Sequence, residues 1–161
     1  MELNLKWANP ISLKALDGAG YAVDLNKLPK AFGVYVFARR FGSAIEALYV
    51  GQALDIQSRV KQQLNNLKLM KAIKYSKKKN SKKKNSSHIG KRVVITGQFI
   101  AGRAQQHKKC LLLIERSLIR YFLSEGNDLV NEQGTHLRRH EIKSVSHMPK
   151  SFIPTKIFLD A

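Results

Sequence analysis

The sequence predicts one small α+β domain spanning residues 1–161, because strand and helix signals alternate along a chain of moderate length. Hydrophobic residues make up 43% of the 161 residues, enough to bury a core without disulfides or metal. Short runs of alternating β-branched and aromatic residues predict strands, and two longer segments with apolar residues at helical spacing predict helices. We therefore expect a three-stranded antiparallel or mixed sheet flanked by helices, with extra segments at both termini.

The terminal segments are predicted to add short elements to this body. Apolar residues alternate over 3–7 as in an edge strand, and the Asp-Gly-Ala-Gly run at 17–20 is a cluster of turn residues. Near the other end, the residues around 138–140 and 152–154 are expected to supply another helix turn and a final edge strand.

Three longer strand signals define the sheet. Residues 32–37 and 46–50 are rich in β-branched and aromatic residues, and a loop is predicted between them at 39–43. Because two such runs joined by a short loop pair most simply as a hairpin, we expect them to be antiparallel. Residues 91–100, with the sequence KRVVITGQFI, predict the third strand.

Two helices are predicted from apolar residues at intervals of three and four. The first begins at Asp55, a suitable N-cap, and runs to about Lys74. The second covers about 104–124 and is followed by Gly126, a residue type that commonly ends helices. The apolar stripe of the second helix consists of Leu111, Ile114, Leu118 and Phe122.

The charge of the chain predicts a polyanionic partner. The sequence contains 29 Lys and Arg against 11 Asp and Glu, a formal net charge of +18. Such a field favours nucleic acid over an anionic membrane surface or a nonspecific effect on solubility. No stretch reaches the roughly 18 apolar residues of a membrane span, and the single cysteine, Cys110, forms no disulfide within the chain. We therefore expect a cytoplasmic protein without membrane contact.

A tandem repeat, SKKKNSKKKN, lies between the first predicted helix and the third strand. It has no apolar residue, so residues 75–90 are predicted to form a mobile loop. Two interpretations stand: a solvated loop without a role, or an arm that contacts nucleic-acid phosphates. The basic residues predicted to contact nucleic acid are Lys61, Lys77, Lys78, Lys79, Lys82, Lys83, Lys84, Lys91 and Arg92.

Glu115 is unusual because it lies on the apolar stripe of the second predicted helix. It follows Leu111 by four residues and precedes Leu118 by three, so its carboxylate is expected to face the protein rather than solvent. An unpaired buried carboxylate is costly. It needs either an ion pair, with Arg59 or Arg116, or a hard divalent cation, which prefers carboxylate oxygen. Position alone leaves both open.

Motifs in the hairpin and the first helix make the chain resemble the GIY-YIG nuclease family. The hairpin carries both half-motifs, with Val in place of the family's frequent Ile, and the family's arginine, metal-binding glutamate and downstream asparagine follow in the right order. The resemblance spans about 32–132, roughly two-thirds of the chain. The matched positions are Gly33-Val34-Tyr35, Tyr49-Val50-Gly51, Arg59, Glu115 and Asn131.

The resemblance implies a GIY-YIG-like α+β fold and cleavage of phosphodiester bonds with the help of one Mg²⁺ or Mn²⁺ ion. A phosphodiester carries negative charge and is a poor electrophile, so its cleavage needs charge neutralisation, an activated water and a stabilised leaving oxygen. By resemblance, Glu115 would hold the metal ion. Arg59 would hold the non-bridging phosphate oxygens with a planar fork that Lys cannot match.

The resemblance also implies roles for the motif residues of the hairpin. Tyr35 and Tyr49 are expected on the same side of the hairpin, and one of them would orient or deprotonate the attacking water. Gly33 and Gly51 would let the backbone crowd close to the hairpin and the phosphate. Asn131 is either catalytic, as the family match implies, or the cap of a turn.

One position departs from the family pattern. Many members carry His or Tyr one helical turn after the arginine, and Gln63 occupies that place here. Gln cannot act as a general base, so this role passes to a Tyr, to Lys61 or, if they lie close in space, to His88 or His107. His107 and Cys110 are spaced like half a zinc site but lack a second pair, so structural zinc is not expected.

The sequence thus predicts a divalent-metal-dependent DNA endonuclease, restriction-like or of low specificity. Two alternatives remain open. One is a catalytically weak or inactive nucleic-acid-binding module of the same fold, and the other is a structural basic protein without any site geometry. The expected partner is DNA, with RNA as an alternative, and the chain is expected to act as a monomer or a homodimer.

Overall fold

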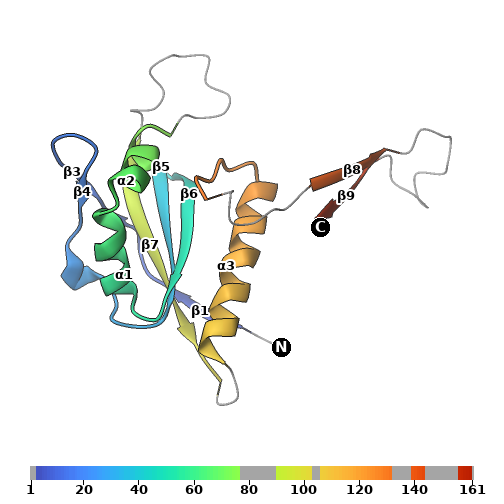
Figure 1. Cartoon of the computed structure of the whole chain (residues 1–161), viewed down its shortest axis with the longest axis horizontal. Helices are drawn as coiled ribbons and strands as arrows, with labels where there is room; N and C mark the ends of the chain where they lie inside the picture. The colour runs from blue at the N-terminus through green and yellow to red at the C-terminus, as the bar shows by residue number, and fades with distance from the viewer. Residues whose placement is uncertain (1–2, 77–89, 103–105, 132–138, 144–155, 161) are drawn as a thin grey trace.

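A computed structural model of the chain describes residues 3–76, 90–102, 106–131, 139–143 and 156–160 (Figure 1). The architecture is α+β, as predicted: a five-stranded antiparallel sheet with helices on both faces. The strands of the sheet are β1 (Asn4–Trp7), β2 (Ile11–Ser12), β5 (Gly33–Phe41), β6 (Ala44–Ala53) and β7 (Lys91–Ile100), and the helices are α1 (Ile56–Leu64), α2 (Leu67–Lys74) and α3 (His107–Ser124).

The middle strand of the sheet is β5, which pairs antiparallel with β6 on one side and with β7 on the other. The predicted hairpin and the third strand at 91–100 are therefore confirmed. The sheet has five strands rather than three because β1 and β2, from the lead-in segment, both pair with the outer edge of β7. The loop predicted at 39–43 is shorter, since β5 continues to Phe41 and Gly42, with φ of 54°, turns the chain.

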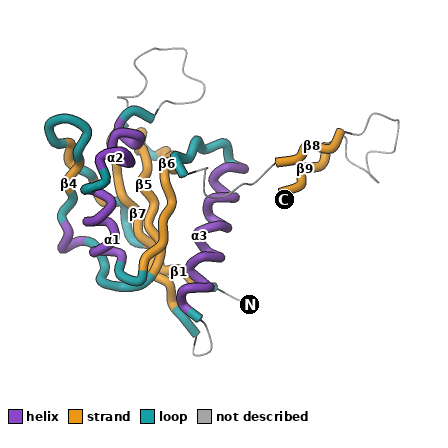
Figure 2. Tube along the Cα trace, in the orientation of Figure 1, coloured by secondary structure: helices purple, strands orange, loops and turns teal. Residues whose placement is uncertain are grey.

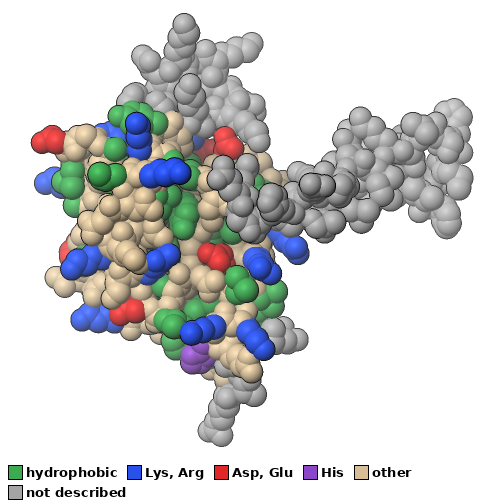
Figure 3. Space-filling model, in the orientation of Figure 1, with side chains coloured by type: hydrophobic (Ala, Val, Ile, Leu, Met, Phe, Trp, Pro, Cys, Tyr) green, Lys and Arg blue, Asp and Glu red, His purple; other side chains and the backbone are tan. Residues whose placement is uncertain are grey.

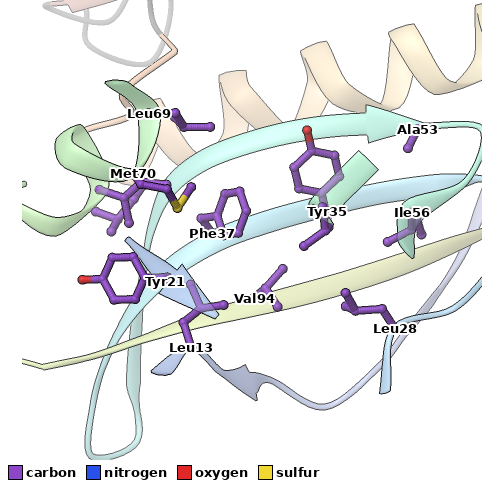
Figure 4. Close-up of a cluster of buried hydrophobic side chains, with 13 residues drawn as sticks. Leu13, Tyr21, Leu28, Tyr35, Phe37, Ala53, Ile56, Leu69, Met70 and Val94 are labelled. Atoms are coloured by element: carbon purple, nitrogen blue, oxygen red, sulfur yellow. The ribbon is translucent and has the colours of Figure 1, made fainter. Parts of the chain in front are cut away.

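Alternation along β5 divides the core into two layers. Tyr35 and Phe37 point to the face covered by α1 and α2, where they pack with Ile56 and Met70 (Figure 4). Val34 points to the opposite face, which is covered by α3. Figures 1 and 2 show α1 and α2 on one side of the sheet and α3 on the other. The edge of β6 thus lies between two helical layers.

The single helix predicted from Asp55 to Lys74 is wrong, because the chain breaks at Asn65 and Asn66 into α1 and α2. The side chain of Asn66 accepts a hydrogen bond of 3.1 Å from the backbone N–H of Leu69 and so caps α2. Asn side chains compete with helical backbone hydrogen bonds in this way, and here they override a continuous apolar stripe.

Short elements complete the fold. The predicted turn at 17–20 joins β3 (Lys14–Ala15) to β4 (Tyr21–Ala22), which is followed by the 3-10 helix η1 (Leu25–Lys27). The helix turn predicted near 138–140 is wrong, because β8 (Arg139–Lys143) is a strand paired with β9 (Lys156–Asp160). Residues 152–154 lie outside the described residues. Among the helices that the structure describes, none is long and apolar enough to cross a bilayer.

Candidate active site

The structure brings four of the predicted site residues to the β6 edge of the sheet. Tyr35 comes from β5, Tyr49 from β6, Arg59 from α1 on one face and Glu115 from α3 on the other. The charge of Arg59 is close enough to lower the pKa of both Tyr35 and Glu115. Residues from four elements therefore converge, which the alternative of a structural basic protein without site geometry did not predict.

The two tyrosines lie on the same face of the hairpin, as expected. Tyr35 pairs with Gly51 and Tyr49 pairs with Phe37, so the tyrosines are diagonal neighbours, and their ring centroids are 6.2 Å apart. Tyr35 is only 1% exposed, whereas Tyr49 is partly exposed. Solvent thus reaches Tyr49 more readily than Tyr35.

Burial raises the pKa of the Tyr35 hydroxyl above its ordinary value, and the neighbouring Tyr49 raises it further. A hydrogen bond from Gln63 and the charge of Arg59 lower it, but the net shift is upward. Tyr35 is therefore a poor base. Its hydroxyl is suited to hold its neighbours in position rather than to accept a proton from water.

Gln63 lies inside the protein against Tyr35, with 7% of its surface exposed. Gln63 was expected at the place of the family's catalytic His or Tyr, and its burial was not predicted. A signal was present: with Ile56 and Val60, Gln63 continues the inward stripe of α1 at spacings of four and three residues. Gln63 thus supports Tyr35 from within and does not face solvent.

The motif glycines allow two close approaches within the sheet. A Cβ atom at Gly51 would lie 2.3 Å from Cζ of Tyr35, so the tyrosine ring rests directly on the glycine backbone. A Cβ atom at Gly33 would lie 2.2 Å from the carbonyl oxygen of Gly97 on β7. Neither glycine has a positive φ, so backbone conformation does not require them. They are needed because a larger residue would not fit.

Gly51→Ala is expected to displace the Tyr35 ring and to lower the free energy of unfolding by about 1–3 kcal/mol, the usual cost of overpacking a core. Urea denaturation of the variant and the wild type measures this loss. Gly20→Ala is the matched control, because its Cβ would meet Leu16 at an ordinary 3.6 Å. Equal stability losses in the two variants would contradict the close approach at Gly51.

The Glu115 carboxylate is half-buried on α3, facing the protein as its sequence position predicted. It accepts a hydrogen bond of 3.1 Å from Nε2 of Gln52 on β6. Burial raises the pKa of Glu115, although the hydrogen bonds of Gln52 and the charges of Arg116 and Arg59 oppose the shift. Within the described residues, neither arginine forms an ion pair with Glu115; the ion pair recorded there joins Arg39 to Glu46 at 3.1 Å.

The surroundings of Glu115 fit a hydrated divalent cation better than a closed metal site. Within the described part of the chain, no three His, Cys, Asp or Glu residues gather in a way that could hold a metal. Mg²⁺, however, commonly uses one or two carboxylates and keeps several waters. The pKa of Glu115 is raised because burial desolvates its carboxylate, while Gln52, Arg116 and Arg59 favour the charged form. One carboxylate, partly open to solvent, is compatible with that chemistry.

Asn131 holds the edge of β6. Its Nδ2 donates to the carbonyl oxygen of Val50 at 2.7 Å, and its Oδ1 accepts from the Val50 N–H at 3.4 Å. Asn127 accepts from the Ala47 N–H at 2.8 Å in the same way. Both polar atoms of the Asn131 side chain are thus engaged next to Tyr49, which makes Asn131 a positioning residue for the strand rather than a turn cap.

The basic residues predicted to contact nucleic acid differ in accessibility. Lys61 on α1 and Lys91 at the start of β7 are exposed. Arg92 is 5% exposed, and its guanidinium donates to the backbone carbonyls of Ile73, Lys74 and Gly90. The prediction for Arg92 is therefore corrected: a guanidinium used to join α2 to β7 does not face a polyanion. The six lysines of the tandem repeat lie outside the described residues.

Two histidines, His88 and His107, were predicted as alternatives for the base that Gln63 cannot supply. His88 lies outside the described residues. The ring of His107 is stacked on Phe32 at a centroid distance of 4.2 Å and meets Phe99 edge-on. His107 is thus an exposed residue whose ring rests on these two phenylalanines at the beginning of α3, two turns before Glu115.

No family model, curated protein or solved structure matches the chain. The functional interpretation therefore depends on the site geometry and on the motif resemblance. Both concern the same residues: Tyr35 and Tyr49 are in ring contact, Glu115 bonds to Gln52 on β6, and the charge of Arg59 acts on Tyr35 and Glu115.

Proposed function

We propose that the protein is a divalent-metal-dependent endonuclease of the GIY-YIG type that hydrolyses DNA phosphodiester bonds. The observation that carries the proposal is the convergence of Tyr35, Tyr49, Arg59 and Glu115 from four elements at the β6 edge. An antiparallel hairpin next to a third strand, followed by a glutamate-bearing helix, is also the arrangement that the family resemblance led us to expect.

In this proposal each side chain has a role set by its surroundings. Arg59 is exposed on α1, so its guanidinium can hold the non-bridging oxygens of a phosphate in a bidentate manner. Tyr49 is the more accessible tyrosine and orients the attacking water. Tyr35 and Gln63 hold the Tyr49 ring in position from the buried side. Glu115 would hold a Mg²⁺ or Mn²⁺ ion, which when bound neutralises phosphate charge and stabilises the leaving oxygen.

Incubation of the purified protein with supercoiled plasmid tests the proposal. Nicked or linear plasmid is expected with Mg²⁺ or Mn²⁺ and not with EDTA.

A second candidate function is a DNA-binding module of the same fold without cleavage, which is favoured by the buried Gln63 at the position of the family's His or Tyr. Tight plasmid binding without nicking at any metal concentration would favour this module, and absence of binding would refute both.

Arg59→Lys is expected to impair cleavage nearly as strongly as Arg59→Ala, by on the order of 10²- to 10³-fold. The reason is that Lys retains the charge but not the planar fork that holds two oxygens at once. Initial rates of plasmid nicking measure the effect. Lys14→Ala, which removes an exposed cation on β3 away from α1, is the control and should cost much less. Wild-type rates in Arg59→Lys would contradict the bidentate role.

A further inference from the structure

The outward face of α3 carries a row of exposed cations. Lys109, Arg116 and Arg120 are all exposed, and their spacings of seven and four residues put them on one side of the helix. We call these three residues the α3 stripe. It begins near the first turn of the helix and ends one turn before its last residue. None of the three was singled out as a nucleic-acid contact from the sequence.

The α3 stripe has no acidic partner at the positions where helical ion pairs form. The residues three and four positions from Arg116 and Arg120 include no Asp or Glu. Across the described ranges, the one recorded ion pair does not involve the stripe. Arg116 and Arg120 are themselves like charges at a spacing of four residues, an arrangement that costs a helix about 0.2–0.5 kcal/mol. Within the described residues, ion pairing therefore does not explain the stripe.

Lys109 is also unfavourable for the helix that carries it. It lies in the first turn, where the helix dipole is positive, and that turn contains no acidic residue. A cation there opposes the dipole instead of complementing it. The positive charges of Lys109 and of the Arg116–Arg120 pair thus lower the stability of α3. Such a cost is expected where charges are retained to bind an external anion.

The sign of the surface changes beyond the α3 stripe. A hollow of about 420 Å³ lies at the C-terminal end of α3, and its charged lining residues are Glu46, which is paired with Arg39, and Glu125. Phosphates would be attracted along the stripe and repelled by Glu125 at this hollow. On the other side, the stripe adjoins the candidate site, because Arg116 directly follows Glu115 and its charge acts on that carboxylate. Figure 3 shows Lys and Arg side chains on the α1 side as well as on the α3 side of this face.

We propose that the α3 stripe is a phosphate-contact surface that continues the candidate site, so that the backbone of the DNA substrate follows α3 from Lys109 to Arg120 and stays clear of Glu125. This inference rests on the proposed function, because it names a further part of the surface that holds the same substrate. It implies contacts on both sides of the scissile phosphate, with Arg59 on the α1 side and the stripe on the α3 side.

The salt dependence of DNA binding tests the α3 stripe. Fluorescence anisotropy with a labelled 30-base-pair duplex, in EDTA to prevent cleavage, gives the binding constant at several salt concentrations. Each phosphate contact contributes about 0.9 to the slope of log K against log salt. The double variant R116Q/R120Q is therefore expected to reduce the slope by about 1.8. Its melting temperature should not fall, because a like-charge pair is removed.

The control is K14Q/K27Q, which removes two exposed lysines from β3 and η1 and so loses the same charge elsewhere. It should change the slope much less, and E125Q should not weaken binding. Equal slopes for R116Q/R120Q and K14Q/K27Q would overturn the α3 stripe, even if the wild type binds and nicks DNA and the proposed function stands. A wild type that neither binds nor nicks DNA would remove the proposed function and the stripe together.

Discussion

Glu115→Gln is expected to reduce DNA cleavage by on the order of 10³-fold while leaving DNA affinity roughly intact. The amide keeps the size of the side chain and can still bond to Gln52, but it loses the charge that would hold a divalent ion. Plasmid nicking in Mg²⁺ measures the first effect, and duplex binding in EDTA measures the second. Glu125→Gln, an exposed carboxylate at the end of the same helix, is the matched control and should cleave normally.

Glu115→Gln is also expected to be more stable than the wild type at neutral pH. Burial raises the pKa of Glu115 above its unfolded value. A carboxyl group with a raised folded pKa favours the folded state below its unfolded pKa, and this contribution is lost as the pH rises through the folded pKa. Glu115→Gln should therefore gain stability relative to the wild type as the pH rises above the ordinary carboxyl range. Thermal melts at acidic and neutral pH measure that difference.

These two measurements separate a functional carboxylate from a structural one. If Glu115 held the fold together through an ion pair, its removal would lower stability at neutral pH, where both partners are charged. A residue kept for a ligand gives the opposite result, with lost activity and gained stability. Full cleavage activity in Glu115→Gln would remove Glu115 from the metal site.

Local sequence patterns were sufficient to predict features that depend on a single strand, hairpin or helix. The alternation at 91–100 predicted β7 with its observed bounds, and the half-motif spacing predicted that Tyr35 and Tyr49 share a face. Glu115 could be found because a carboxylate on an apolar helical stripe conflicts with packing. In each case the signal lies within one strand, one hairpin or one helix.

Local patterns failed where a distant segment supplies the partner. Arg39 was expected in a loop, yet it is fully buried, paired with Glu46 and bonded to the carbonyl of Ser76 at 2.9 Å. Arg92 is likewise buried because the carbonyls at the end of α2 accept its N–H groups. Neither of these contacts between distant segments can be predicted from the residues that flank the arginines. For Arg39 and Arg92, the tertiary structure thus determines the partner, and the net charge of the chain does not reveal it.

Tyr49→Phe is expected to slow cleavage by about 10²- to 10⁴-fold with little loss of stability, because it removes the hydroxyl that solvent can reach. Tyr35→Phe is expected to act mainly on stability, lowering the free energy of unfolding by about 1–3 kcal/mol. The reason is that loss of the Tyr35 hydroxyl leaves the amide of Gln63 buried without its partner. Plasmid nicking rates and urea denaturation on both variants measure the two effects.

The double variant Tyr35→Phe/Gln63→Leu distinguishes a supporting role for Tyr35 from a chemical one. Replacing both members of a buried hydrogen-bonded pair by apolar groups of similar shape is nearly neutral, whereas replacing one is costly. If Tyr35 only supports Tyr49, the double variant should recover the stability lost in Tyr35→Phe and keep substantial cleavage. If it recovers stability but cleaves no better than Tyr49→Phe, Tyr35 takes part in activating the water despite its burial, and the assignment of that role to Tyr49 alone is wrong.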